Sequence, residues 1–157
     1  MRCIKPKSIT IALVLLVGVG LATATAQSNQ FVDEVLAQDR ISYGNAAYLL
    51  LLGSGDLDES ATVAEARDRF ESGPAALGRG VDEPVTLGEY SLLAMDAFGI
   101  TGGMMYTLVP SPRYAARELS FRDVIQGRAY PRMDISGERA MRLIGRVLTL
   151  DEQGRLR

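Results

Sequence analysis

Three arginines near the end of the chain have the spacing of one helical face. Arg139, Arg142 and Arg146 follow one another at i, i+3 and i+7, and side chains at such intervals are neighbours on a helix surface. The planar guanidinium group matches phosphate or carboxylate in a bidentate geometry. The spacing therefore predicts a surface for an anionic envelope polymer or an acidic partner. A solvated helix face, partly ion-paired with acidic side chains, is the alternative.

A second candidate for binding is the apolar segment that follows Gly102 and Gly103. Methionine is unbranched and polarizable, and it packs adaptably against irregular surfaces. If this segment stays exposed, it is a surface for a partner protein; the alternative is that it closes the core between helices. The predicted contact residues are Met104, Met105, Tyr106 and Leu108.

The sequence offers little for catalysis. It contains no His, and its single Cys is Cys3, which excludes a Ser-His-Asp triad, a zinc hydrolase site and a thiol nucleophile. Glu89 and Asp96 are seven residues apart, about 10 Å along a helix, at the far edge of the separation in inverting glycosidases. Asp56, Asp58 and Glu59 lack the later ligands of a calcium loop. We therefore expect no enzyme activity, no cofactor and no metal site.

The first 26 residues predict export. Arg2, Lys5 and Lys7 precede an apolar run over 9–21, and Ala24-Thr25-Ala26 provides a cleavage site, which is the pattern of a signal peptide. The run is shorter than the roughly 20 residues that span a bilayer. Cleavage after Ala26 would leave no stable transmembrane span and an exported chain that is periplasmic or associated with the cell envelope. An uncleaved anchor is the alternative.

Charge is distributed unevenly along the remaining chain. Residues 27–110 contain 4 Arg and 13 acidic residues, whereas residues 111–157 contain 10 Arg and 6 acidic residues. The second half therefore either binds an anionic partner or packs against the acidic first half. For an exported and net acidic protein, we expect no nucleic-acid partner.

The pattern of caps and apolar residues predicts an all-α fold. Thr62 with Glu65 and Thr86 with Glu89 form capping boxes, and Ser111-Pro112 places proline at a first helical position. We expect one helical domain over 27–150 and a frayed polar tail over 151–157. The predicted helices cover 29–38, 42–52, 62–71, 86–98, 111–119 and 136–150.

Three of these helices begin alike. A β-branched residue precedes a Ser or Thr at Ile41-Ser42, Val85-Thr86 and Ile135-Ser136. Apolar residues then recur four, seven and eight positions after each Ser or Thr, which places them on one helical face. The starts are 44 and 50 residues apart, which suits a two-helix unit repeated about three times. Unrelated amphipathic helices with similar caps are the alternative.

These segments resemble S-layer homology repeats, whose signature is an Ile-Thr-Arg-x-Glu helix start preceded by a Phe-x-Asp-Val segment. Val85-Thr86-Leu87-Gly88-Glu89 matches four of the five positions of the first in kind, and Phe121-Arg122-Asp123-Val124 matches the second. The resemblance implies a pseudo-threefold helical bundle that docks onto cell-wall polymer. The family's polymer-binding Arg is replaced here by Tyr43, Leu87 and Gly137. The chain also resembles small exported envelope proteins of unknown role in spirochaetes.

The sequence as a whole predicts a non-catalytic module of the envelope with a structural or adaptor role. Its partner would be an envelope protein or a cell-wall polymer. A periplasmic binding protein for a lipid or a cell-wall fragment is the first alternative, and a carboxylate-based wall hydrolase is the second. The predicted contact residues are Met104, Met105, Tyr106, Leu108, Arg139, Arg142 and Arg146.

Overall fold

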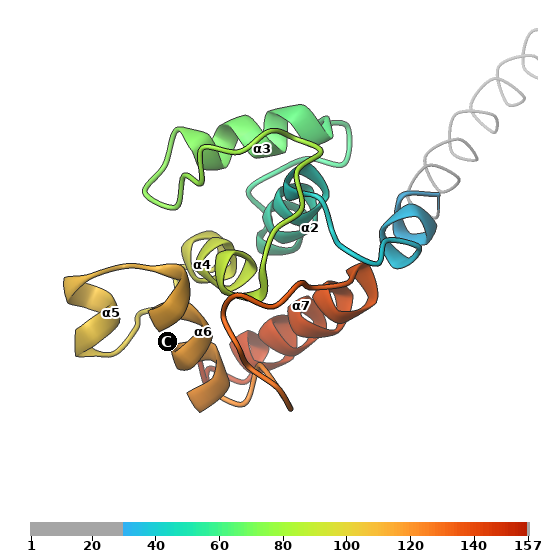
Figure 1. Cartoon of the computed structure of the whole chain (residues 1–157). Helices are drawn as coiled ribbons and strands as arrows, with labels where there is room; N and C mark the ends of the chain where they lie inside the picture. The colour runs from blue at the N-terminus through green and yellow to red at the C-terminus, as the bar shows by residue number, and fades with distance from the viewer. Residues whose placement is uncertain (1–29, 157) are drawn as a thin grey trace, which may run out of the picture. The chain divides into compact units, whose positions relative to one another are not determined.

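The computed structural model describes residues 30–156 of the chain (Figure 1). The signal peptide predicted over 1–26 lies outside the described residues. The chain divides into two units, and residues 30–34 belong to the first while residues 35–156 lie in the second. All the contacts discussed below lie within the second unit.

The described part of the chain is helical, which confirms the all-α prediction. A short helical stretch covers 30–36. Residues 30–156 contain no extended strand, only isolated β-bridges that pair Ser42 with Pro84 and Thr86 with Asp134. No helix within these residues is long and apolar enough to cross a membrane. The named helices are α2 (Tyr43–Ser54), α3 (Val63–Glu71), α4 (Leu87–Ala97), α5 (Met104–Leu108), α6 (Pro112–Phe121) and α7 (Gly137–Glu152).

The predicted caps set the beginnings of these helices. The side chains of Ser42, Thr86 and Ser136 each accept a hydrogen bond from the backbone N–H three residues later, which satisfies a donor that the helix itself cannot pair. Capping boxes form at the start of α3 and of α4. The end of α2 lies later than predicted, because the helix continues through Gly53 and ends at Gly55, whose φ of 81° is left-handed.

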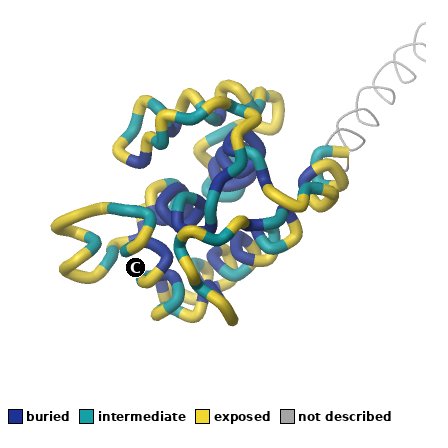
Figure 2. Tube along the Cα trace, viewed as in Figure 1, coloured by how far each residue is buried: buried dark blue, intermediate teal, exposed yellow. Residues whose placement is uncertain are grey.

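The three similar helices bury the same face. All nine residues at the fourth, seventh and eighth positions after the caps are buried. In Figure 1, α2, α4 and α7 come together, and Figure 2 shows that their inner sides are buried. In addition, α3 packs on α2 and α6 packs on α4. The nine residues are Ala46, Leu49, Leu50, Tyr90, Leu93, Ala94, Ala140, Leu143 and Ile144.

The starts of α2, α4 and α7 are joined in cyclic order by backbone hydrogen bonds. The first N–H of α2 donates to Glu83 O at 2.7 Å, just before the start of α4. The first N–H of α4 donates to Met133 O at 2.9 Å, just before the start of α7. The first N–H of α7 donates to Gln38 O at 2.9 Å, just before the start of α2. Each helix start is therefore completed by the segment that leads into another, which supports a true repeat.

Two glycines permit the close approach at these starts. A Cβ atom at Gly88 would lie 2.9 Å from the backbone oxygens of Pro112 and Pro131, and one at Gly137 would lie 1.7 Å from that of Val35. Gly137 occupies a position where the resemblance to S-layer homology repeats expects arginine. The backbone of Val35 leaves no room there for any side chain.

The end of the chain differs from the predicted frayed tail. Helix α7 continues to Glu152, and Leu156 is buried. Arg122 explains this order, because its guanidinium donates to Leu156 O at 2.8 Å and to Thr101 O at 2.5 Å while pairing with Glu118 Oε1 at 3.1 Å. One side chain thus connects α6, the loop after α4 and the C-terminal segment.

Candidate functional site

The predicted contact residues lie in two separate places. Met104, Met105, Tyr106 and Leu108 belong to α5, whereas Arg139, Arg142 and Arg146 belong to α7. Met104, Met105 and Tyr106 line one cleft, and the three arginines line another. Leu108 is exposed on α5 but is not among the lining residues. A third cleft, lined by residues from other parts of the chain, was not predicted.

The apolar segment after Gly102 does not close the core. Helix α5 buries none of its residues, and the exposed fraction reaches 77% for Met104 and 70% for Leu108. Phe121, at the end of α6, is 84% exposed. We name this surface the α5–α6 patch, and its exposed large apolar residues are Met104, Met105, Leu108, Val109 and Phe121.

Tyr106 differs from its neighbours because it faces inward. A Cβ at Gly102 would lie only 2.4 Å from the Tyr106 ring, so the ring packs directly on the backbone of Gly102. Burial, and then the nearby carboxylate of Asp96, raise the pKa of the Tyr106 hydroxyl. Tyr106 therefore supports the short α5 helix more than it offers a free contact.

A groove of about 310 Å³ lies within the α5–α6 patch. Arg117 and Glu118 of α6 provide its polar edge. The remaining described residues that line it are glycine, methionine or aromatic, namely Gly103, Met104, Met105, Tyr106, Tyr114 and Phe121. The groove thus has the size and the apolar lining to receive a partner's side chain.

The arginines of α7 line a cleft of about 400 Å³, which we name the α7 cleft. Val124 and Leu143 are buried and provide apolar contacts, and Met133 lies beside them. Gln126 and Arg128 approach from the loop before α7. None of the described residues that line the cleft is acidic.

Backbone acceptors orient two of the three α7 arginines. Arg139 donates to Arg128 O and contacts Met133 Sδ at 3.3 Å, and Arg146 donates to Asp123 O at 2.9 Å. These contacts fix the guanidinium groups but leave their charges unneutralised. Burial and the nearby Arg142 lower the pKa of Arg139.

A larger cleft of about 780 Å³ lies at the start of α4, and we name it the α4 cleft. Arg79 pairs with Glu89 Oε1 at 2.7 Å within it. Tyr130 is 70% exposed on another side. Sequence reasoning missed this cleft because its residues come from two loops and from the starts of α4 and α6, which share no common period. The described lining residues are Arg79, Thr86, Glu89, Ser111, Pro112, Arg113, Tyr130, Pro131 and Arg132.

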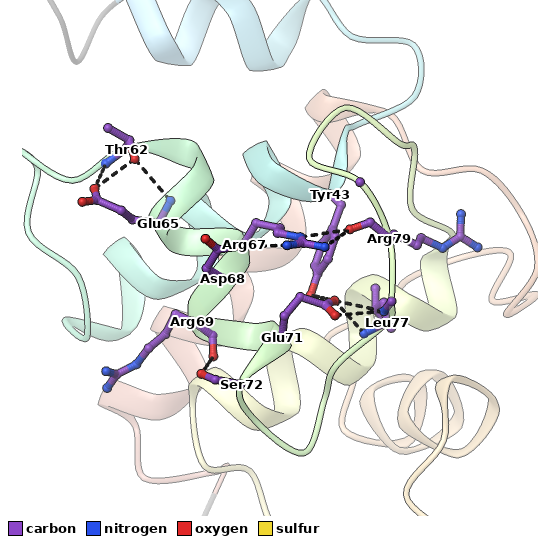
Figure 3. Close-up of polar contacts among 12 residues, drawn as sticks. Tyr43, Thr62, Glu65, Arg67, Asp68, Arg69, Glu71, Ser72, Leu77 and Arg79 are labelled. Atoms are coloured by element: carbon purple, nitrogen blue, oxygen red, sulfur yellow. Dashed lines mark hydrogen bonds and ion pairs between the residues drawn. The ribbon is translucent and has the colours of Figure 1, made fainter.

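A polar network between α2 and α3 holds the loop that carries Arg79 (Figure 3). The Tyr43 hydroxyl donates to Glu71 Oε1 at 2.9 Å, and the backbone N–H groups of Leu77 and Gly78 donate to the same oxygen at 3.0 Å. Arg67 donates twice to Arg79 O, at 2.9 and 2.8 Å. The loop is therefore anchored at Leu77 and Gly78 and at the backbone of Arg79, the residue that pairs with Glu89.

Glu71 predicts a pH dependence of stability. Burial raises the pKa of its carboxyl, but the hydrogen bonds from Tyr43, Leu77 and Gly78 outweigh burial and lower the pKa below its ordinary value. The contribution of Glu71 is therefore fully present above the pKa of the unfolded chain and is lost as the pH falls through the folded pKa. We expect Glu71→Gln to reduce the free energy of unfolding by about 1 kcal/mol at pH 7, allowing for partial exposure.

Urea unfolding of both proteins at neutral and acidic pH measures this effect. The difference between wild type and Glu71→Gln should shrink as the pH falls below the ordinary pKa of a glutamate and through the lower pKa of Glu71 in the folded protein. Glu152→Gln, an exposed change at the end of α7, is the control and should leave stability nearly unchanged. A difference that grows toward acidic pH would contradict the assigned direction of the shift.

Glu89 and Asp96, the two acidic residues considered for catalysis, do not line a common cleft. Glu89 is held by Thr86 and Arg79, as the capping box predicts. Burial raises the pKa of Asp96, but Asp96 does not line the α4 cleft beside Glu89. Among the described residues, no group of three or more His, Cys, Asp or Glu side chains is arranged to hold a metal ion.

Comparisons with protein-family models, with curated proteins and with solved structures give no match for this chain.

Proposed function

We propose that this chain is a non-catalytic exported module of the cell envelope that acts as an adaptor. Its α5–α6 patch would dock a partner protein. The observation that carries the proposal is the exposure of five large apolar side chains on two adjoining helices. Full burial of one such side chain at an interface would contribute about 1.5–3 kcal/mol of favourable free energy.

The placement of the patch supports binding to a protein. Helix α5 is a single short helix that contributes nothing to the core, and it is attached mainly to α6. Thr107 and the ring of Tyr106 tie it to the preceding glycines. The α5–α6 patch is therefore ordered although it exposes apolar side chains to water. A role as a contact surface for a partner would explain why it is exposed.

The chemistry of the patch indicates the kind of partner. Apolar residues surround the groove, whereas Arg117 and Glu118 lie at its edge, as the apolar centre and polar rim of a protein interface do. A partner that inserts a Leu, Met or Phe side chain would fill the groove. Methionines in the lining can adjust to the shape of that side chain.

Crosslinking of the wild type and of variants in the α5–α6 patch tests the adaptor proposal. The full chain is crosslinked in intact envelopes, together with Met104→Asp and Phe121→Asp. We expect one defined protein to be captured by the wild type and its yield to fall at least tenfold in each variant, because an aspartate must be desolvated at the interface. Leu148→Asp changes an exposed apolar residue of α7 outside the patch and should retain capture.

Two results would contradict the adaptor proposal. One is equal capture by wild type and both patch variants. The other is recovery of glycan or lipid without protein. Circular dichroism of each variant confirms that the helices remain folded. Since Met104 and Phe121 are 77% and 84% exposed, we expect the unfolding free energies of their variants to remain within about 0.5 kcal/mol of wild type. Leu148 is 37% exposed, so its variant must be shown to be folded before its capture is compared.

Contact with cell-wall polymer is the second candidate function, and the α4 cleft favours it. The family's arginine is absent at Leu87, but Arg113 at the start of α6 and Arg132 in the loop before α7 supply cations, while Arg79 is paired with Glu89. Tyr130 adds an exposed ring against which a sugar can stack. Recovery of glycan in the crosslinking experiment, lost on Tyr130→Ala, would favour this function. Each of the three clefts described has at most one carboxylate among its described lining residues, which supports binding over two-carboxylate hydrolysis.

A further inference from the structure

The α7 cleft gathers positive charge that the described chain does not neutralise. Arg128, Arg139, Arg142 and Arg146 line it, and no described lining residue is acidic. Of these four, only Arg142 forms an ion pair with a described residue, at 3.6 Å from Glu138. Both partners of that pair are about two-thirds exposed, at 67% and 66%, so the pair opposes little of the charge.

The cleft holds its cations in fixed positions. Arg139 and Arg146 each donate to a backbone carbonyl of the opposing loop. A guanidinium has five N–H donors, so most of them stay available after one such bond. Like charges held together repel one another, and a bound anion would relieve that repulsion.

Charge and lining together indicate the chemistry of the ligand. A phosphate group accepts bidentate hydrogen bonds from arginine, and its second negative charge suits several guanidinium groups better than a single carboxylate does. Val124, Met133 and Leu143 provide apolar contacts beside the arginines. The volume of about 400 Å³ exceeds the needs of phosphate alone and leaves room for the carbon skeleton of a small polyol.

We propose that the α7 cleft binds the phosphate of a polyol phosphate, such as glycerol phosphate, through Arg139, Arg142 and Arg146. The ester carbons lie against Met133, the most exposed of the three apolar residues that line the cleft. Glu138 competes with the phosphate for Arg142. This site is separate from the α5–α6 patch and does not depend on the adaptor function.

Calorimetric titration of the full chain with sn-glycerol 3-phosphate at low ionic strength tests the site. We expect saturable binding with one site per chain. Arg142→Gln and Arg146→Gln should each weaken it at least tenfold. Glu138→Gln should tighten it severalfold, because Arg142 is then released. That gain would not arise if these residues had only a structural role.

A matched variant controls for net charge. Arg69→Gln removes one exposed arginine from α3, outside the cleft, and should change affinity less than twofold. Equal weakening by Arg69→Gln and Arg142→Gln would overturn the site, as would failure of every probe to bind. Inorganic phosphate binding as tightly as the ester would overturn the role assigned to the polyol.

A second arm distinguishes a free ester from a lipid headgroup. Vesicles of phosphatidylglycerol and phosphatidylcholine are sedimented with the protein, and phosphatidylcholine alone is the control. Binding that requires phosphatidylglycerol and is lost in Arg142→Gln would show that the polyol phosphate bound by the cleft is a lipid headgroup. Vesicle binding that is unchanged in Arg142→Gln would overturn the assignment to this cleft.

Discussion

Gly137→Ala is expected to lower the free energy of unfolding by about 3 kcal/mol, near the upper end of the cost of overpacking. The added Cβ would lie 1.7 Å from the backbone oxygen of Val35 and 2.6 Å from its carbonyl carbon. Since both atoms belong to the backbone, a side-chain rotation cannot relieve the clash. Moving Val35 would also disturb the bond from the Gly137 N–H to Gln38 O.

The same substitution elsewhere in α7 provides the control. A Cβ at Gly145 would meet nothing within 4 Å, and alanine is favoured over glycine inside a helix by about 1 kcal/mol. Gly145→Ala should therefore stabilise the protein while Gly137→Ala destabilises it. Urea unfolding followed by circular dichroism measures both. Equal effects of the two substitutions would show that the close approach to Val35 does not exist.

Arg122→Ala is expected to lower the free energy of unfolding by about 2–3 kcal/mol, because charge-assisted hydrogen bonds contribute more than neutral ones. The change removes donors to Thr101 O and Leu156 O and breaks the pair with Glu118. The C-terminal segment should loosen first. Hydrogen exchange at residues 153–156 should become faster than the change in global stability alone explains.

Arg117→Ala is the matched control for Arg122→Ala, since Arg117 lies in α6 and Arg122 is the residue that caps its C-terminal end. Arg117 is exposed and forms no ion pair with a described residue, so its loss should change stability by less than about 0.5 kcal/mol. If the two variants were equally stable, Arg122 would not connect the three segments. Slow exchange at the C-terminal segment in Arg122→Ala would lead to the same conclusion.

The local features of this fold could be predicted because they depend on neighbours in sequence. A Ser or Thr cap acts on an N–H three residues away, and the starts of α2, α4 and α7 all follow this rule. The buried face of each repeat helix follows from the helical period alone. Exposed polar residues such as Arg142 likewise lie where the period places them.

The remaining features depend on segments that are distant in sequence. Leu156 is buried, and Arg122, which caps the distant helix α6, donates a hydrogen bond to its backbone oxygen. The α4 cleft combines Arg79, Arg113 and Arg132 from three segments that are distant in sequence. The sequence could not show whether the apolar segment after Gly102 is exposed, because composition does not decide whether a run of methionines faces the core or solvent. The identity of the repeats as S-layer homology repeats stays a prediction.

The candidate site likewise combines features that depend on local sequence with features that depend on distant segments. The spacing of Arg139, Arg142 and Arg146 predicted a shared face, and all three line one cleft. The opposing loop with Arg128 and Gln126 could not be inferred, since nothing local places it beside α7. The ring of Tyr106 packs on Gly102 and also lines the groove of the α5–α6 patch, and its contact with a partner stays a prediction. Gly102 belongs to no recognisable motif, so the packing of the Tyr106 ring on its backbone could not be predicted from the sequence.

The cyclic order of the helix starts has a consequence for how the chain folds. In an open array of repeats, a terminal unit can unravel while its neighbours persist. Here the segment before α2 completes α7, so the two ends of the compact unit must meet before the last helix start is satisfied. Contacts of such long sequence separation slow folding. Unfolding should be a single cooperative transition, because opening any one repeat leaves unpaired backbone donors in another.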